Sequence, residues 1–481
     1  MTSRPMPSQD SLWLFLDRPT NLLTITSVLW TADPIDPGRL RSVVEERLLN
    51  RYPVFRRRAV VEGTLLRAAR WEDDPDFDLN RHLLVRPMPA PGTRTALQDY
   101  VAAQRGIPLD HTHPLWTMHL LQGYDAGSGP GSAVVQRYHH AMADGIRLTQ
   151  VMFGILDPLE PGYRAPGASG GGNGPRHRGP RLSDQVAALV RWLGGGLVVD
   201  VAGAVTAVLP PILRPDRILD AAAGTGTALL NSAGSVVKIL GWANPPSVLS
   251  GDPGVDKTAV WGDPVPLELL KGIGRATGTT VNDVSLALVA GAVARYLAEC
   301  RAGADGDVGD LAWMVPVNLE PFDDDLPAEL GNHFALVLAV LPHGIADFGE
   351  RLAEVHRRMG RIRDSYEPLL TYATQRGIAM SPAPVAARIS EFLTEKAVGV
   401  LTNVPGPRRP MVLAGARVDG VVGWAPCSDR QTITICIFSY AGQVSVAFGT
   451  DRTVLPAPER LVAAFDAEVA EITGKIVKRE L

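Results

Sequence analysis

The residues with the clearest chemical potential lie at positions 138–145, where His139 and His140 are followed by Asp144 and Gly145. A β-rich run ends at the two histidines, so we expect an imidazole at a strand end, where its ring can face a cleft. A neutral imidazole, with an ordinary pKa of about 6.5, can accept the proton of an alcohol that attacks an acyl carbonyl. We therefore predict that His140 is a general base with His139 beside it. Asp144 is expected to orient the loop, and Gly145 to allow positive φ or close backbone approach.

Two histidines at a strand end also have a simpler interpretation, a polar terminus without a catalytic role. The chain has only 10 histidines in 481 residues. A chance occurrence of H-H-x-x-x-D-G is therefore expected about one time in a thousand, which favours the catalytic interpretation.

A metal centre is the main chemical alternative, because His111 and His113 could join His139 and His140 as zinc ligands. Zinc sites usually recruit carboxylates or thiolates at recognisable spacing, and none is evident here, so we predict no metal and no bound cofactor. The three arginines at 56–58 are expected to form a solvated face, with phosphate contact as the alternative. Outside the Gly/Pro-rich stretch at 161–181 the sequence has no G-x-S-x-G elbow, so direct attack by an acceptor is favoured over a covalent acyl-enzyme.

Alternating strands and helices must position the histidine loop within the first 160 residues. Residues 24–30 are β-rich, and Asp36 followed by Pro37 marks the start of an amphipathic helix. A helix is then expected over 95–104, and further strands over 116–122 and 133–139, joined by a Gly and Ser turn.

The second half repeats this mixture of helices and strands. The expected helices span 267–277, 282–300, 348–366 and 457–473, and the expected strands span 311–317, 334–341 and 397–404. Residues 432–440 and 443–448 alternate around Ala441-Gly442, the strongest hairpin signal in the chain. We predict an α/β fold with an N-terminal half at 1–160, a Gly/Pro-rich crossover and apolar connector at 161–264, and a C-terminal half at 265–481.

Composition narrows the classes of partner and compartment. Lys and Arg number 47 against 51 Asp and Glu, a net charge of −4, so no general positive field exists to hold nucleic acid. Three cysteines fit neither a disulfide framework nor a metal knuckle, which favours the cytoplasm. The first ten residues do not resemble a secretory signal, and the apolar stretch at 182–213 is expected to lie in an interface rather than to span a membrane.

Several motifs together resemble the bacterial wax ester synthase/diacylglycerol acyltransferase family. His139, His140, Asp144 and Gly145 match its H-H-x-x-x-D-G motif. The other matching stretches are Pro114-Leu115-Trp116, Asn282-Asp283-Val284 and Thr402-Asn403-Val404-Pro405-Gly406-Pro407, with weaker similarity at Val315–Asn318, Gly331-Asn332 and Ser439-Tyr440. They occur in the family's order, and the resemblance covers essentially the whole chain. Thr402 stands where Ser is common, which keeps the hydroxyl.

The resemblance implies two chloramphenicol acetyltransferase-like halves joined by a long crossover, with a substrate tunnel between them. It implies acyl transfer from acyl-CoA to diacylglycerol or to a long-chain alcohol, with His140 as the general base. Asn282 would face the tunnel and donate to the thioester oxyanion, although an ordinary helix N-cap is the competing interpretation.

We expect mainly structural roles for the remaining motif residues. Asp283 should brace its loop, and Pro114 and Trp116 should pack. Thr402, Asn403 and Gly406 are expected to form a turn after a strand, with a place beside the CoA arm as the alternative.

Two other functions fit the same sequence features. One is a condensation-domain-like or polyketide-associated acyltransferase that takes its acyl group from a carrier protein. The other is a non-catalytic lipid-binding or droplet-coating protein. For the leading function we expect a cytoplasmic enzyme that associates peripherally with membranes or lipid droplets, because both substrates are long-chain amphiphiles.

Overall fold

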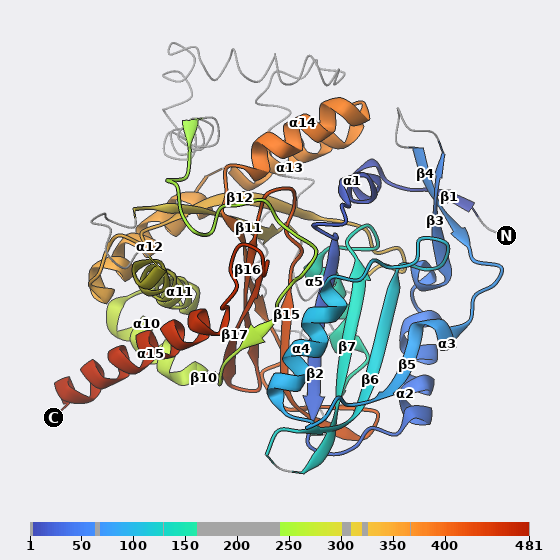
Figure 1. Ribbon diagram of the computed structural model, residues 1–481, viewed down its shortest axis with the longest axis horizontal. Coiled ribbons are helices and arrows are strands. Elements are labelled where there is room, and N and C mark those ends of the chain that lie inside the picture. The colour runs from blue at the N-terminus through green and yellow to red at the C-terminus, as the bar shows by residue number, and fades with distance from the viewer. Residues whose placement is uncertain are drawn as a thin grey trace, which may run out of the picture.

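The computed structural model describes residues 3–62, 68–127, 129–160, 241–300, 309–319, 326–365 and 367–480. Two seven-stranded sheets dominate this part of the chain, and a three-stranded sheet lies near the N-terminus (Figure 1). Residues 161–240 of the predicted crossover and connector at 161–264, including the apolar stretch at 182–213, lie outside the described residues.

The first sheet holds the strand that ends at the paired histidines. Its order is β5-β6-β7-β2-β15-β14-β8. The strands are β5 (Leu83–Pro87), β6 (Trp116–Asp125), β7 (Pro130–His139), β2 (Thr24–Thr31), β15 (Ala416–Trp424), β14 (Met411–Leu413) and β8 (Asp157–Pro158). Because β7 has β6 and β2 on either side and is buried over nearly its whole length, its C-terminal end is held firmly in place.

The second sheet has the order β10-β17-β16-β13-β11-β12, with β9 also paired to β17. Its strands are β9 (Val260–Trp261), β10 (Val265–Pro266), β11 (Leu311–Asn318), β12 (Phe334–Leu341), β13 (Gly399–Pro405), β16 (Ile433–Tyr440) and β17 (Gln443–Thr450). The predicted hairpin is β16 and β17. Its turn places Ala441 and Gly442 at φ of 48° and 80°, the positive values that a tight hairpin turn needs.

One strand from the C-terminal part of the chain completes the first sheet. β15 pairs antiparallel with β2 and continues the sheet to β14 and β8. Residues 265–481 therefore contribute strands to both large sheets, and the two halves share backbone hydrogen bonds as well as side-chain packing. The small sheet, β1 (Ser3–Pro5), β4 (Ala68–Asp73) and β3 (Arg57–Glu62), stands beside the first half.

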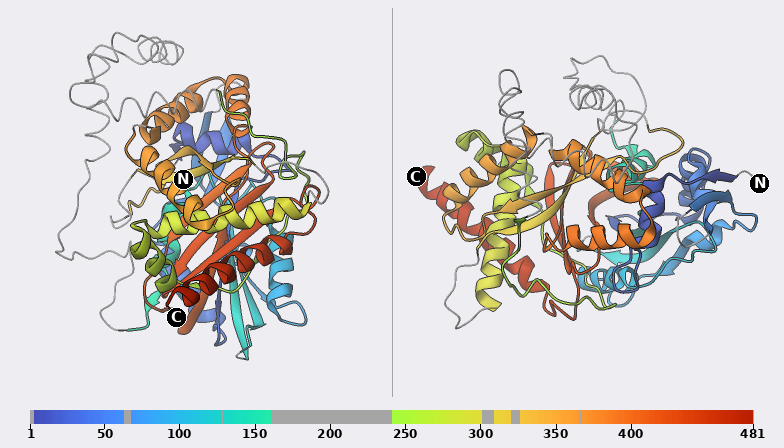
Figure 2. Two further views of the ribbon diagram at one scale, coloured as in Figure 1. Left: turned by 90° about the vertical axis from the view of Figure 1, so that its left-hand side faces the viewer. Right: turned by 90° about the horizontal axis from the view of Figure 1, so that it is seen from above.

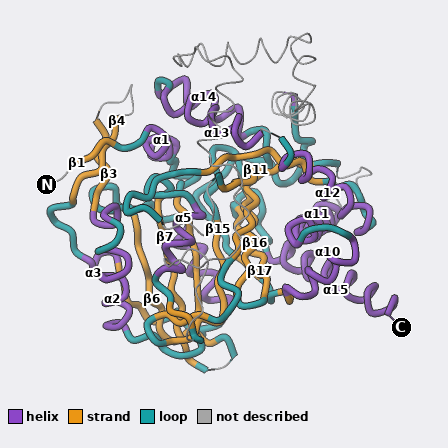
Figure 3. The backbone as a smooth tube through the Cα atoms, turned by 180° about the vertical axis from the view of Figure 1, so that it is seen from behind, coloured by secondary structure: helices purple, strands orange, loops and turns teal. Residues whose placement is uncertain are grey.

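Helices cover both large sheets. In chain order they are α1 (Ser8–Leu16), α2 (Pro37–Val44), η1 (Glu45–Leu49), η2 (Pro53–Arg56), α3 (Leu79–His82), α4 (Arg94–Arg105), α5 (Gly145–Gly154), α10 (Leu267–Thr277), α11 (Val281–Cys300), α12 (Phe348–Arg363), α13 (Glu367–Met380), α14 (Ala383–Thr394) and α15 (Glu459–Glu480). Figure 2 shows α11 and α15 covering one face of the second sheet. In Figure 3, α13 and α14 lie beside α1, which α13 contacts directly.

The helix predictions are largely confirmed, and they follow from local signals. Asp36 caps α2, with its side chain accepting from the Arg39 N–H, and Pro37 occupies the first turn. Helix α11 alone among the described helices is long and apolar enough to cross a membrane, but most of it is buried inside the protein. The sequence prediction missed α1, α13, α14 and the small sheet.

Candidate active site

Strand β7 delivers the two histidines to a loop fixed on both sides by backbone hydrogen bonds. The His139 N–H donates to Leu115 O at 3.0 Å, and the His140 N–H donates to Leu23 O at 2.8 Å. Neighbouring strands β6 and β2 thus anchor the first two residues of the motif. Local rigidity of this kind is what positions a catalytic side chain.

The imidazole of His140 is enclosed by aromatic rings. Its centroid lies 4.4 Å from that of Trp13 on α1 and 5.3 Å from that of Phe334 on β12. Only 8% of His140 is exposed, and its Nδ1 has no hydrogen-bond partner among the described residues. Burial lowers the pKa of His140 to about 4, because an apolar surrounding disfavours the charged imidazolium. The ring is therefore neutral at physiological pH, as a general base must be before it acts.

Asp144 fixes the loop instead of contacting the imidazole. It caps α5, where Oδ1 accepts from the Arg147 N–H at 2.9 Å, and Oδ2 accepts from the His333 N–H at 2.8 Å. The carboxylate therefore joins the histidine loop to the segment before β12. These contacts suit the predicted orienting role.

Gly145 does not have the predicted conformation. It begins α5 and is absent from the residues with positive φ. A Cβ there would meet only Ile25 Cδ1, at 3.9 Å. Neither a left-handed backbone nor a close approach requires glycine at this position, because α5 begins with ordinary helical geometry.

A second anchor of the loop comes from Asn332 and Asp10. Asn332 Nδ2 donates to His140 O at 2.9 Å and to Asp10 Oδ1 at 2.8 Å, and the Asn332 N–H donates to the same Asp10 oxygen at 3.1 Å. Ala143 also forms a parallel bridge with Gly331. Burial raises the pKa of Asp10 to about 6, although the hydrogen bonds from Asn332 oppose the shift. Helix α1 thus helps to hold the catalytic loop.

Sequence reasoning missed Asp10 and Trp13 because α1 was not predicted. The run from Ser8 to Leu16 carries an acidic residue in its first turn and mostly apolar residues afterwards, which is a usable helix signal. No local pattern indicated that this helix would reach the histidines.

His139 contacts a different group of residues. Its Nδ1 accepts from the Ala141 N–H at 3.1 Å, and its Nε2 lies 3.5 Å from Asp17 Oδ2. His111 Nε2 lies 3.6 Å from the same oxygen. Burial would raise the pKa of Asp17, but hydrogen bonds from His111 and His139 outweigh it and hold that pKa below its usual range.

The cluster of Asp17, His111 and His139 has the composition of a metal site, and no sequence pattern indicated that Asp17 would join the two histidines. The tautomer of His139 argues against such a site. Because Nδ1 accepts a backbone N–H, the neutral ring carries its proton on Nε2 and has no lone pair there for a metal. His113 lies apart from this cluster, with Nδ1 2.9 Å from Asp74 Oδ2. The cluster therefore does not fit a metal ion.

The structure brings two of the distant motifs together at Asn282 and Asn403. Asn403 Nδ2 donates to Asn282 Oδ1 at 2.8 Å, and both side chains are exposed. Asn282 is not the N-cap of α11. The cap is the reciprocal pair Thr280 and Asp283, in which each side chain accepts the other residue's backbone N–H. Within the described residues no hydrogen bond joins Asn282 to His140, so an oxyanion role stays a prediction.

Asp283, Pro114 and Trp116 have structural contacts. Asp283 Oδ2 lies 2.8 Å from His356 Nδ1 and is almost fully buried. Trp116 is fully buried, and its Nε1 donates to Phe55 O at 2.9 Å. Pro114 is buried just before it. These contacts agree with the bracing and packing expected from the sequence.

Thr402 and Asn403 lie in a strand and not in the predicted turn. They belong to β13, which pairs in parallel with β16. Gly406 follows the strand, where a Cβ would clash with Ser439 O, so close backbone approach explains this glycine. The turn prediction was wrong because the pairing with β16 extends the strand through Pro405.

Two of the three arginines at 56–58, which were predicted to form a solvated face, form ion pairs. Arg57 forms ion pairs with Asp73 and Glu329, and Arg58 with Glu72. These pairs give little support to the alternative of phosphate contact.

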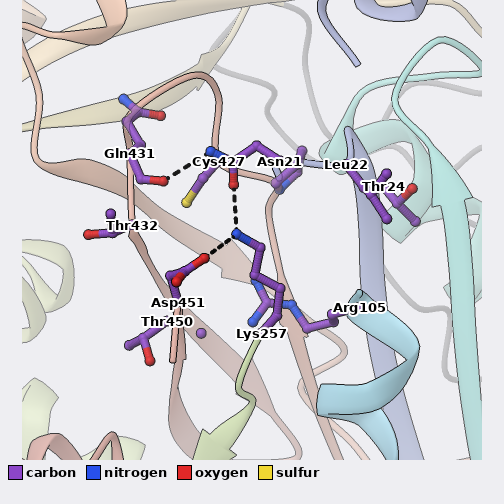
Figure 4. Close-up of a pocket in the computed structure, with 12 residues that line it drawn as sticks. Asn21, Leu22, Thr24, Arg105, Lys257, Cys427, Gln431, Thr432, Thr450 and Asp451 are labelled. Atoms are coloured by element: carbon purple, nitrogen blue, oxygen red, sulfur yellow. Dashed lines mark hydrogen bonds and ion pairs between the residues drawn. The ribbon is translucent and has the colours of Figure 1, made fainter. Parts of the chain in front are cut away.

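Two of the cavities among the described residues have linings that do not include His140. One lies between the two halves and is lined by Asn21, Arg105, Lys257 and Asp451, among others (Figure 4). The other is lined by Arg81, His82 and neighbours near Trp116. The tunnel implied by the resemblance stays a prediction. The rings of Trp13 and Phe334 pack against that of His140.

The two large sheets, the first completed by a strand from the C-terminal part of the chain and carrying the paired histidines where β7 ends, define a two-half α/β fold of the condensation-domain type. A wax ester synthase/diacylglycerol acyltransferase from Marinobacter aquaeolei VT8 shares this fold, with a TM-score of 0.63, 21% identity and coverage of 97% of this chain and 98% of that one. The first condensation domain of the calcium-dependent antibiotic synthetase shares it with a TM-score of 0.57 at 15% identity, covering 98% and 97% of the two chains.

Sequence comparison gives the family. The wax ester synthase/diacylglycerol acyltransferase catalytic domain matches residues 6–285, and the C-terminal domain of the same family matches 330–473. The chain therefore belongs to the wax ester synthase/diacylglycerol acyltransferase family and is an acyltransferase.

Named relatives agree with this assignment. The probable diacylglycerol O-acyltransferase tgs2 of Mycobacterium tuberculosis is 26% identical, covering 97% of this chain and 98% of that protein. The O-acyltransferase WSD of Acinetobacter baylyi is 24% identical, covering 85% and 84%.

Proposed function

We propose that this protein transfers a long-chain acyl group from acyl-CoA to the hydroxyl of diacylglycerol or of a fatty alcohol. The observation that carries the proposal is the neutral imidazole of His140, held at a strand end by Leu23, Asn332 and the Asp144-capped loop. A rigid, uncharged base in an apolar surrounding suits proton removal from an alcohol, whose own pKa is far above neutral.

The reaction needs one base and no covalent enzyme intermediate. His140 takes the hydroxyl proton as the acceptor oxygen attacks the thioester carbonyl, and a C–O bond forms. When the tetrahedral intermediate collapses, the C–S bond breaks, and the proton passes from the imidazolium to the departing sulfur, which leaves as free CoA thiol. Burial raises the pKa of the Cys427 and Cys436 thiols to about 11, so these two groups stay protonated and are poor nucleophiles. We propose that the reaction requires no cofactor.

Access to His140 requires Trp13 and Phe334 to move apart. Their rings supply the apolar surface that an acyl chain would contact, and they keep water from hydrolysing the thioester. Opening at this point would connect the base to the region between the halves.

We also propose peripheral association of this cytoplasmic enzyme with membranes or lipid droplets. Both substrates are amphiphiles that concentrate at such surfaces. Met380, Val385 and Phe392 on α13 and α14 are 52%, 47% and 41% exposed, and apolar side chains of this kind suit an interfacial contact. Flotation of the protein with lipid vesicles tests this part separately.

The test of the activity is release of CoA from palmitoyl-CoA with diacylglycerol or hexadecanol as acceptor. His140→Gln should reduce the rate at least about a hundredfold, since general-base catalysis contributes about 10²–10⁴. His343→Gln is the matched control, because His343 is equally buried and burial also lowers its pKa to about 4. A folded His140→Gln enzyme with full activity rejects the base assignment. The two acceptors in competition show which one the enzyme prefers.

A further inference from the structure

The cavity between the two halves is lined by an unusual set of charged side chains (Figure 4). Asn21, Leu22, Thr24 and Arg105 come from the first half, and Lys257 comes from the segment that leads into the second half. The remaining lining residues are Pro426, Cys427, Gln431, Thr432, Gly449, Thr450 and Asp451. The mechanism above uses none of these groups.

Lys257 and Asp451 neutralise each other. Lys257 Nζ lies 2.6 Å from Asp451 Oδ2 and donates to Asn21 Oδ1 at 3.1 Å. The Lys257 side chain is 10% exposed and that of Asp451 is fully buried. A buried pair with short contacts of this kind leaves no net charge on the cavity wall.

Arg105 adds a second positive charge. The carboxylate that acts on this charge, Asp451, is already paired with Lys257. Its Nη1 donates to Thr258 O, and its guanidinium lies over the ring of Trp424, 5.8 Å from the centroid. Among the described residues no ion pair is formed by Arg105. The Arg105 side chain is half-buried, and burial lowers the pKa of Arg105 to about 10, so it remains charged at neutral pH.

Neither of the other candidate anions neutralises this charge. Cys427 is a neutral thiol, because burial raises its pKa to about 11. Asp429 accepts at Oδ2 from Thr394, outside the cavity lining. The wall therefore carries two cations and one carboxylate.

The position of the Arg105 guanidinium depends on the absence of a side chain at Gly449. A Cβ at Gly449 would clash with Arg105 Nη1 and with the ring of Trp424. The guanidinium therefore lies close to the backbone of β17, at the cavity that Arg105 helps to line. A partly desolvated charge without an ion pair of its own is destabilising, which makes an anionic ligand favourable here.

We propose that this cavity binds a small monovalent anion, a halide ion or a small carboxylate, between Arg105 and Lys257. The cavity volume of about 20 Å³ holds about one water-sized group, which suits a halide better than a phosphate. The bound anion contacts groups from both halves and so holds them together. It also stabilises the segment around Asn21, two residues before the carbonyl of Leu23 that accepts from His140.

Bromide gives the direct test. Crystals of the full-length protein soaked in bromide should show an anomalous peak within hydrogen-bond distance of Arg105. If no peak appears in this cavity, the proposal is overturned. In solution, line broadening of the ³⁵Cl resonance by the wild-type protein should be lost in Arg105→Gln and kept in Arg388→Gln, whose side chain is 86% exposed.

Stability gives an independent readout. Thermal unfolding is compared in chloride, formate and the bulky anion gluconate at equal ionic strength. Chloride raised from about 1 to about 100 mM should increase the folding equilibrium constant about tenfold if the dissociation constant is about 10 mM. A larger effect of formate would identify a carboxylate as the preferred ligand. Equal midpoints in all three salts would contradict the proposal.

Discussion

Replacing Asp10 by Asn should remove a specific pH dependence from the stability of the protein. Asp10 is 3% exposed and accepts two hydrogen bonds from Asn332 at one oxygen. Burial is the main cause that raises its pKa from 3.8 to about 6 in the folded state. The carboxylate holds the loop of His140, but it is ionised at neutral pH in a place that disfavours its charge.

The size and sign of the effect follow from proton linkage. A pKa raised by about two units corresponds to about 3 kcal/mol. Between about pH 4 and pH 6 the folded protein holds a proton that the unfolded chain has lost, so stability from this group falls as the pH rises. The contribution is fully present below about pH 4 and is lost above about pH 6. Asn cannot titrate, so the variant lacks this loss.

The assay is urea unfolding of both proteins, followed by tryptophan fluorescence over about pH 4 to pH 7. The free energy of unfolding of Asp10→Asn minus that of the wild type should rise by about 3 kcal/mol across this range. Any change in the hydrogen bonds to Asn332 adds only a constant offset. Asp263→Asn is the control, because the Asp263 side chain is 82% exposed. The free energy of unfolding of this variant should change with pH in the same way as that of the wild type. A difference for Asp10→Asn that stays constant with pH would refute the reasoning.

Further variants test other contacts. The acid limb of the pH–rate profile for CoA release should lie near pH 4, the pKa of His140. Trp13→Ala exposes the His140 imidazole and should move the acid limb toward about pH 6.5. The same change should lower the free energy of unfolding by about 3–5 kcal/mol. An acid limb that stays near pH 4 would contradict the burial argument. Gly406→Ala should destabilise by about 1–3 kcal/mol through its clash. Gly145→Ala, whose nearest neighbour is 3.9 Å away, should keep the wild-type melting temperature. Asp283→Ala should cost about 1 kcal/mol by removing the helix cap, measured by urea unfolding.

The sequence by itself determined the elements whose signals are local. The cap at Asp36, the hairpin turn at Ala441-Gly442 and the periodicity of α11 each depend on residues a few positions apart. The strand that ends at His139 and the orienting role of Asp144 at the start of the next segment were accessible in the same way. The motifs were also sufficient for the family, because their order along the chain needs no coordinates.

The tertiary structure decided what surrounds the histidines. Trp13, His140 and Phe334 are far apart in the sequence, yet their rings pack together. Asp10 and Asn332 meet behind the same loop. The lowered pKa of His140 is a consequence of this packing, since desolvation depends on every neighbour and not on the residue type. A sequence motif can identify the general base. Its charge, the rings that pack on it and the hydrogen bonds that hold its loop depend on long-range contacts.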